Sequence, residues 1–176
     1  TLDGAETIAS QDMQLGGLIE RRSKSVIILI NKWDLSEDVS DSYRNDVKKM
    51  VYAHLPHLKF APILFVSGKT GYRVNQILPL ITQIAHSRKT MIEQDVLDKF
   101  MHRILKQHKP ARGKGTRQPK VLGFKQLRCD PPIFEMRIKY RTSIHRSYVS
   151  YVENRLREDF NFTGTPIVIK LTKMRK

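Results

Sequence analysis

A four-residue pattern of the form N-K-x-D stands early in the chain and could recognise a guanine base. Its members are Asn31, Lys32, Trp33 and Asp34. Guanine presents two adjacent donors, N1–H and the N2 amine, and a single Asp34 carboxylate can accept hydrogen bonds from both. Adenine lacks this pair of donors, so it would leave the carboxylate without a partner. Asn31 would reach the purine N7 and tether the neighbouring loops, and the aliphatic stem of Lys32 would cover the plane of the base.

A second polar loop contains Ser67, Gly68 and Lys69, and it follows the apolar residues 62–66. The N-K-x-D pattern also follows an apolar run, and a helical pattern separates the two. Strand, helix and strand predict a βαβ unit, whose two strands end at the same edge of a parallel sheet. At that edge the Gly68 N–H could donate to guanine O6, Ser67 could hold Asp34, and Lys69 could cover the open side of the base.

Other interpretations of these patterns are weaker. Alone, N-K-x-D would be explained equally well by a strand end followed by an N-capping Asp34, but the second loop at this spacing favours the guanine site. Residues 68–70 imitate the end of a P-loop, yet Ile63 stands where that pattern needs glycine. Residues 68–71 also match the G-x-x-G of a KH nucleic-acid clamp, but that clamp joins two helices and this segment follows a strand.

Positive charge is concentrated in the second half of the chain, which as a whole carries a formal +15. Residues 1–86 hold ten Lys and Arg against nine Asp and Glu, whereas residues 87–176 hold twenty-two against eight. We therefore predict two modules, at residues 1–88 and 89–176. A single cysteine, Cys129, fits a reducing cytoplasm. No apolar stretch has the length of a membrane span, and we expect a cytoplasmic monomer.

Hydrophobic periodicity predicts three helices in the first module. They contain residues 10–22, residues 43–51 and residues 74–84. Ser10 could cap the first helix, with Leu15 and Leu18 on its apolar side, and Leu78, Ile81 and Ile84 would share the apolar face of the third. Pro79 conflicts with a helix interior and predicts either a kink or a late start of the third helix. A linker is expected at residues 87–90.

The second module predicts the element order αββαβ. A helix with Asp95 as its cap would place Val96 and Phe100 on one face. The later elements would be strands at residues 121–129 and 133–140, a helix at residues 144–160 that buries Tyr148, Val152 and Leu156, and a strand at residues 167–171. In the second strand Phe134, Met136, Ile138 and Tyr140 alternate with charged residues, so one face would be core and the other solvated and basic.

Eight basic residues of this module are candidates for contact with RNA phosphates. They are Lys109, Arg112, Lys114, Arg117 and Lys120 in the loop of residues 107–120, followed by Arg137, Lys139 and Arg141. Such binding needs no base contacts. The alternatives are a solvated basic face or one that docks on an acidic neighbouring domain. His102, His108 and His145 form no metal-ligand pattern with Cys129, so we expect no metal site in this chain.

The chain resembles the Der (EngA) family of bacterial tandem-G-domain GTPases over nearly its whole length. The matching parts are residues 3–6, 11–12, 31–35 and 67–71, and a tail made of residues 147–157, Phe160 and residues 164–167. One departure is Gly68, which replaces the alanine usual in that loop. The resemblance implies an α/β fold, namely the C-terminal part of a P-loop GTPase doubly wound sheet followed by a small α+β KH-like domain.

The resemblance also implies GTP or GDP as ligand, Mg²⁺ in the intact parent, and as partners the large ribosomal subunit, its RNA and the preceding G domain. However, no P-loop, switch threonine or D-x-x-G phosphate sensor occurs in the 176 residues. Phosphoryl transfer is catalysed mainly by positioning and charge stabilisation around the γ-phosphate and Mg²⁺. We expect a C-terminal fragment of a GTPase without catalytic residues and without activity. The alternative is an RNA-binding protein whose G-like half is a non-catalytic scaffold.

Overall fold

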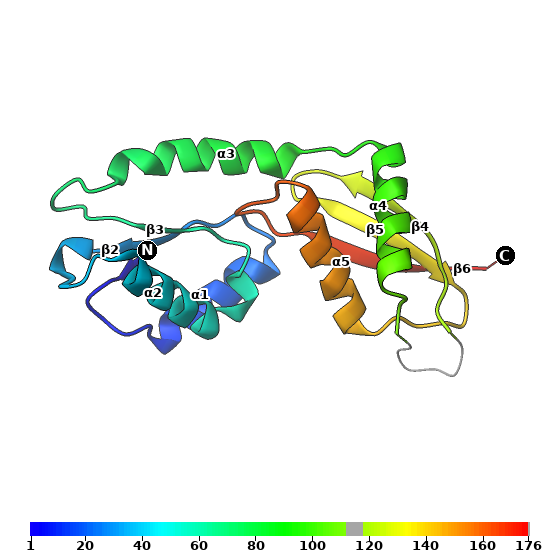
Figure 1. Ribbon diagram of the computed structural model, residues 1–176, viewed down its shortest axis with the longest axis horizontal. Coiled ribbons are helices and arrows are strands. Elements are labelled where there is room, and N and C mark those ends of the chain that lie inside the picture. Colours follow the sequence, from blue (N-terminus) through cyan, green and yellow to red (C-terminus); the bar gives the residue numbers. More distant parts are fainter. Residues whose placement is uncertain (112–117, 176) are drawn as a thin grey trace. The chain divides into compact units, whose positions relative to one another are not determined.

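The computed structural model describes residues 1–111 and 118–175, which form two compact units (Figure 1). The first unit consists of Thr1–Ser87 together with Thr163–Pro166. The second consists of Arg88–Phe162 together with the residues from Ile167 onward. The chain therefore returns to the first unit for a short segment near its end, which no pattern in the sequence predicts.

The first unit is an α/β unit with a three-stranded parallel sheet in the order β1-β2-β3. Its strands and helices are β1 (Leu2–Asp3), α1 (Ser10–Arg21), β2 (Ile28–Asn31), α2 (Asp41–His54), β3 (Ile63–Phe65) and α3 (Ile77–Lys89), with 3-10 turns η1 (Trp33–Leu35), η2 (Pro56–Leu58) and η3 (Val74–Gln76). Figure 1 shows α3 on the opposite side of the sheet from α1 and α2. The predicted strand, helix and strand at β2, α2 and β3 are confirmed.

The core of the first unit lies between β2 and the pair α1 and α2. Ile28 and Ile30, alternate residues of β2, are buried and pack in one cluster with Trp33 and with Val51 from α2. Alternation along a strand puts such residues on one face of the sheet. This cluster fixes which face of β2 meets the helices, and hence how the strand presents its carboxyl end.

Several details of the predicted helices in this unit are wrong. The N-cap of α1 is Ala9, not Ser10, and the Ala9 N–H donates to the Asp12 carboxylate at 3.0 Å. The late start predicted as one of two alternatives at Pro79 is confirmed, because η3 delays the start of α3 and puts Pro79 in its first turn, where the missing N–H needs no partner. The expected linker at residues 87–90 is helical as far as Lys89.

Apolar positions predicted to be buried on α1 and α3 are largely exposed. Leu15 and Leu18 of α1 are each exposed by more than two-fifths, and so is Ile81 of α3. Leu78 of α3 is 73% exposed. The three-stranded sheet therefore covers only part of the apolar sides of these helices. Among the described large apolar residues of α3, Ile84 is the one that is buried.

The segment Thr163–Pro166 is held to the first unit by backbone hydrogen bonds of Gly164. The Gly164 N–H donates to Phe60 O at 2.9 Å, and its carbonyl accepts from Val26 N–H at 2.9 Å. Gly164 has φ +66°, and a Cβ there would lie 2.3 Å from Ile84 Cδ1. Only glycine fits this left-handed, close-packed position. The glycine in the tail of the sequence thus has a packing role.

The second unit has the predicted order αββαβ. Its elements are α4 (Gln94–Gln107), β4 (Val121–Arg128), β5 (Ile133–Lys139), α5 (Arg146–Asp159) and β6 (Val168–Met174). The central strand β5 pairs antiparallel with β4 and parallel with β6. Helices α4 and α5 lie on one face of this sheet (Figure 1). The other face carries no helix among the described elements of the unit.

The core of the second unit confirms most of the predicted burial. Phe134, Met136 and Ile138 point to the helices and are at most 1% exposed, and Tyr148, Val152 and Leu156 of α5 are buried against them. The Tyr148 hydroxyl donates to His108 O at 3.1 Å. Tyr148 is 2% exposed and therefore belongs to the core, and this burial raises its pKa to about 12.

Three predictions in the second unit are wrong. The buried face of α4 consists of Leu97, Phe100, Met101 and Ile104. Val96 is 40% exposed, because the apolar face starts one residue later than predicted. The N-cap is Glu93 rather than Asp95. Tyr140 follows the end of β5 and is 37% exposed, so it is not part of the core.

Candidate guanine-binding site and basic pocket

Parallel pairing brings the two predicted loops together at the carboxyl edge of the first sheet. Ile28 of β2 is in register with Ile63 of β3, and Ile30 with Phe65. The pairing continues past the strand ends, because the Trp33 N–H donates to Val66 O at 3.1 Å. Residues 31–34 and 67–69 therefore leave the sheet next to each other, as the βαβ interpretation predicts.

A hydrogen bond between the loops orients the carboxylate that would read the base. Ser67 is fully buried, and its Oγ donates to Asp34 Oδ1 at 2.5 Å. The same Oγ accepts from the Thr70 N–H at 3.1 Å. Because an ionised carboxylate has about four lone-pair positions, one bond from Ser67 leaves acceptor capacity for two donors of a ligand. Asp34 itself is exposed at this edge.

A second bond between the loops involves Asn31 and Gly68. The Gly68 N–H donates to Asn31 Oδ1 at 3.0 Å, so Asn31 links the loops. The predicted donation of this N–H to guanine O6 stays a prediction, and it requires the amide to move from Asn31 or to be shared with it. Lys69 is exposed beside Gly68, where its predicted role of covering the base stays a prediction.

Lys32 makes a contact that the sequence did not predict. Its Nζ lies 2.5 Å from Asp3 Oδ2, at the end of β1. The hydrogen bond from Lys32, with a second from the Ala5 N–H, holds the pKa of Asp3 below its usual range, and the same pairing raises the pKa of Lys32. Both groups are solvent-accessible, so the pair adds little stability. It positions the Lys32 stem along the sheet edge.

Trp33 is a packing residue of this edge. Its ring is 4% exposed and lies 4.3 Å from Phe65 and 5.8 Å from Tyr43, measured between ring centroids. A cavity of about 210 Å³ lies beside it and is also lined by Asp34, Arg44 and Tyr72. Neither Asn31 nor Lys69 lines this cavity, so it is not the pocket that the N-K-x-D pattern predicts. By packing on Phe65, Trp33 anchors the loop of residues 31–34 to the core.

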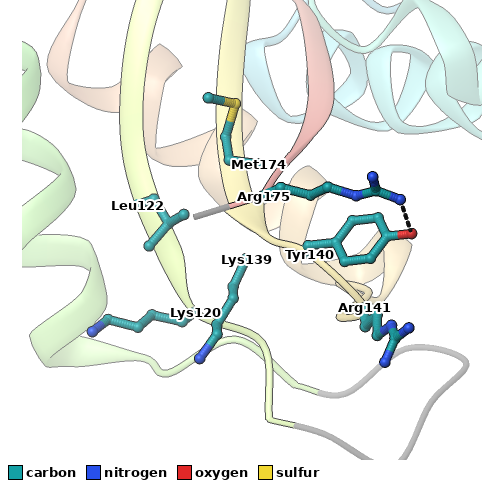
Figure 2. Close-up of a pocket in the computed structure, with 7 residues that line it drawn as sticks. All are labelled: Lys120, Leu122, Lys139, Tyr140, Arg141, Met174 and Arg175. Carbon is teal, nitrogen blue, oxygen red and sulfur yellow. Dashed lines mark hydrogen bonds between the residues drawn. The ribbon is translucent and has the colours of Figure 1, made fainter.

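The predicted RNA-contacting residues fall into separate groups. Arg112, Lys114 and Arg117 lie outside the described residues, and Lys109 is exposed beyond the end of α4. Lys120, Lys139 and Arg141 gather around one cavity of about 470 Å³. Figure 2 shows this basic pocket, which is also lined by Leu122, Tyr140, Met174 and Arg175. Sequence reasoning missed Arg175, since it follows the last strand and matches no pattern there.

Arg137 belongs to a different, internally compensated group centred on Glu135. Thr172 Oγ1 donates to Glu135 Oε1 at 2.8 Å, and Lys125 Nζ and Arg137 Nε lie 3.4 and 3.9 Å from Glu135 Oε2. The bond from Thr172 is the main cause that holds the pKa of Glu135 below its usual range, with a smaller contribution from Lys125. The open face of the sheet is therefore less uniformly basic than predicted.

Two searches of the described residues bear on other kinds of site. Residues 1–111 and 118–175 contain no cluster of three or more His, Cys, Asp or Glu side chains that could hold a metal ion. None of the helices in these ranges combines the length and the apolarity that crossing a bilayer requires.

Comparison with known proteins identifies the family of the chain. Residues 91–172 match a family model described as the KH-domain-like region at the C-terminus of EngA bacterial GTPase enzymes. The chain is 35% identical over 168 residues to GTPase Der of Fusobacterium nucleatum, which covers 96% of this chain and 38% of that protein. It is 33% identical over 172 residues to GTPase Der of Caldanaerobacter subterraneus, with 98% and 39% covered. The chain belongs to the Der (EngA) family.

The shared part is limited in length. GTPase Der of Agathobacter rectalis is 31% identical over 175 residues, which is 99% of this chain and 39% of that protein. This Der-family chain thus spans less than two-fifths of the length of the curated relatives it matches. The match to the C-terminal KH-like region agrees with the αββαβ order of the second unit.

The glycine that departs from the Der pattern has room for a methyl group. A Cβ on Gly68 would have Asn31 Oδ1 as its nearest neighbour at 3.7 Å, an ordinary contact, and the backbone is not left-handed. Gly71, three residues later, has φ +79°, and its N–H donates to Ser67 O at 2.9 Å. The two glycines therefore differ in backbone conformation but not in available space.

We expect opposite effects from alanine at these two positions. Gly68→Ala should raise the free energy of unfolding by about 0.4–1 kcal/mol, because it restricts the unfolded chain at a compatible position. Gly71→Ala should lower it by about 1–2 kcal/mol, the cost of a left-handed conformation for an L residue. Urea unfolding of both variants measures the difference. Equal destabilisation by both would contradict the described geometry of the loop.

Proposed function

We propose that this chain is the guanine-reading and RNA-contacting part of a Der-type GTPase that acts in assembly of the large ribosomal subunit. The observation that carries the guanine-reading part is the Ser67–Asp34 hydrogen bond, which joins two loops at the carboxyl edge of a parallel sheet. The relatives named GTPase Der support GTP as the ligand of the whole protein. In fold terms, the first unit would be the C-terminal half of a doubly wound G domain.

Selectivity for guanine would come from the carboxylate. The second oxygen of Asp34 and the remaining lone pair of Oδ1 accept from N1–H and N2–H, while Ser67 fixes the carboxylate in place. Asn31 reaches N7 with its amide nitrogen, since its Oδ1 already accepts from Gly68. The stems of Lys32 and Lys69 cover the two faces of the base. Adenine would place its N1 acceptor against the carboxylate and offer no donor to it, which disfavours ATP.

Hydrolysis would depend on residues outside these 176. In this proposal the P-loop, the switch residues, the Mg²⁺ ligands and the preceding G domain belong to a part of the protein outside these 176 residues. Exposure of Leu15, Leu18, Leu78 and Ile81 supports it, because additional strands of a G-domain sheet would cover such side chains. No catalytic role is assigned to a residue of this chain.

The second unit would contact ribosomal RNA. Its charge surplus and the pocket formed by Lys120, Lys139 and Arg141 support this role. The alternative function is an RNA-binding protein with a non-catalytic G-like scaffold. Guanine nucleotide turnover by the full-length protein distinguishes the two.

Base specificity tests the first part of the proposal. In the full-length protein, Asp34→Asn should weaken GTP binding by roughly 10- to 100-fold, because it removes charge-assisted hydrogen bonds and puts a donor opposite the N2 amine. Binding of xanthosine triphosphate should improve, since its C2 oxygen accepts from the new amide. Asp46→Asn makes the same charge change on α2 and should alter neither affinity. Unchanged GTP preference in Asp34→Asn would remove Asp34 from the pocket.

Salt dependence tests the second part. The logarithm of RNA affinity should fall linearly with the logarithm of salt concentration, because each neutralised phosphate releases counterions. The double change Lys120→Gln and Arg141→Gln should reduce the slope by about 1.4 for single-stranded RNA, or ~0.7 per contact. Lys24→Gln with Lys59→Gln, at exposed positions of the first unit, should leave the slope as it is. Equal slopes for both double variants would argue against phosphate contacts in the pocket.

A further inference from the structure

The basic pocket lies on the open face of the second sheet, at the carboxyl end of β5. Each strand contributes one lining residue, namely Leu122, Lys139 and Met174, and Lys139 is in register with Met174. Leu122 falls at an irregularity of the β4–β5 pairing. The remaining lining residues precede or follow these strands, so the pocket is built on a rigid hydrogen-bonded frame.

The described residues leave the positive charge in this pocket without a carboxylate partner. Lys120, Lys139, Arg141 and Arg175 all line it. In the part of the chain that the structure describes, none of these four forms an ion pair, and the carboxylate on the same face, Glu135, is engaged by Thr172, Lys125 and Arg137. Like charges around one cavity repel each other, and a bound anion relieves that repulsion. The pocket therefore favours an anionic ligand.

The pocket is also apolar and aromatic, which simple anion binding does not need. The Arg175 guanidinium carbon lies 4.7 Å from the centroid of the Tyr140 ring, and its Nη2 donates to the Tyr140 hydroxyl at 3.1 Å (Figure 2). Leu122 and Met174 are 41% and 39% exposed, so they present apolar surface to the cavity. A ligand that satisfies all of these residues has a flat, weakly polar body and negative charge at its edges.

The turn after β5 holds the aromatic side of the pocket in place. Thr142 closes it, since both its N–H and its Oγ1 donate to Lys139 O, at 3.2 and 2.5 Å. Arg141 has φ +59°, a conformation that is uncommon for residues other than glycine. The Tyr140 N–H is bound to Met174 O at 2.9 Å. Tyr140 and Arg141 are thus fixed at the rim before any ligand arrives.

We propose that the basic pocket binds one unpaired nucleotide of a single-stranded RNA. The base packs on Leu122 and Met174 and against the Tyr140–Arg175 pair, and the flanking phosphates meet Lys120, Lys139 and Arg141. Bases in a duplex are stacked and paired, so they cannot enter, whereas unstacked bases of loops and ends pack on aromatic rings and guanidinium planes. This inference rests on the proposed function, since it presumes that the second unit contacts RNA.

The test compares one RNA sequence in two forms. Anisotropy of a labelled single-stranded dodecamer, and of the same dodecamer annealed to its complement, gives both affinities for the 176-residue chain. Wild-type chain should prefer the single strand. Tyr140→Leu should weaken single-strand binding by roughly 5- to 150-fold, the usual effect of removing one stacking platform, and leave duplex binding unchanged. Tyr140→Phe keeps the ring and should keep the preference.

Other outcomes overturn the inference in distinguishable ways. If Tyr140→Leu and Tyr140→Phe behave alike, or if single strand and duplex bind equally with the same steep salt dependence, the pocket takes phosphates only, and the proposed RNA contact survives without it. Competition by an acidic peptide as strong as by the oligonucleotide assigns the pocket to a protein partner instead. Absence of salt-dependent binding to either RNA form overturns the proposed RNA contact as well.

Discussion

The parallel pairing of β2 with β3 is the constraint on which the proposed guanine site depends. A one-residue shift of β2 would turn Ile28 and Ile30 out of the core, so burial of these side chains fixes the register. With that register, the Trp33 N–H reaches Val66 O and the Ser67 hydroxyl reaches Asp34. Hydrophobic packing in the middle of the strand thus sets the geometry of polar groups at its end.

Charge in the second unit is neutralised at the centre of the sheet and left unpaired at its end, among the described residues. Glu135 compensates Lys125 and Arg137 at the centre of the open sheet face, where a surplus would repel and destabilise the strands. Cations that lack a carboxylate partner in the described chain gather at the end of the sheet, around the pocket with Tyr140. The net charge of the module therefore determines how strongly it attracts polyanions. Glu135 neutralises the centre of the sheet face, so the attraction is strongest at the pocket.

Local patterns in the sequence predict the elements of this chain well. Alternation in β5 and helical spacing in α5 identify Phe134, Met136 and Val152 as core, because periodicity follows directly from strand and helix geometry. The convergence of residues 31–34 with residues 67–69 is also predictable, since parallel strands end at one edge of the sheet. Each of these inferences uses neighbours in sequence or a fixed topological rule.

Features that depend on distant contacts are not predictable in this way. The Asp3–Lys32 pair, the contribution of Arg175 to the pocket and the return of Thr163–Pro166 to the first unit join residues far apart in sequence. The one-residue error at Val96 arose because two apolar faces fit the α4 sequence, and packing on β4 and β5 selects the one with Leu97 and Met101. Tertiary contacts decide between such alternatives.

The central claim, that residues of these two loops read guanine, is tested most directly by NMR titration of the ¹⁵N-labelled 176-residue chain with GMP and with AMP. The two ligands carry the same charge, so binding to basic surfaces affects both titrations equally. GMP should shift the backbone amides of residues 31–34 and 67–70, with an affinity no tighter than about millimolar because the base alone contributes. AMP should leave those amides unshifted. Equal shifts of those amides by both nucleotides, or GMP shifts confined to other residues, would contradict the account.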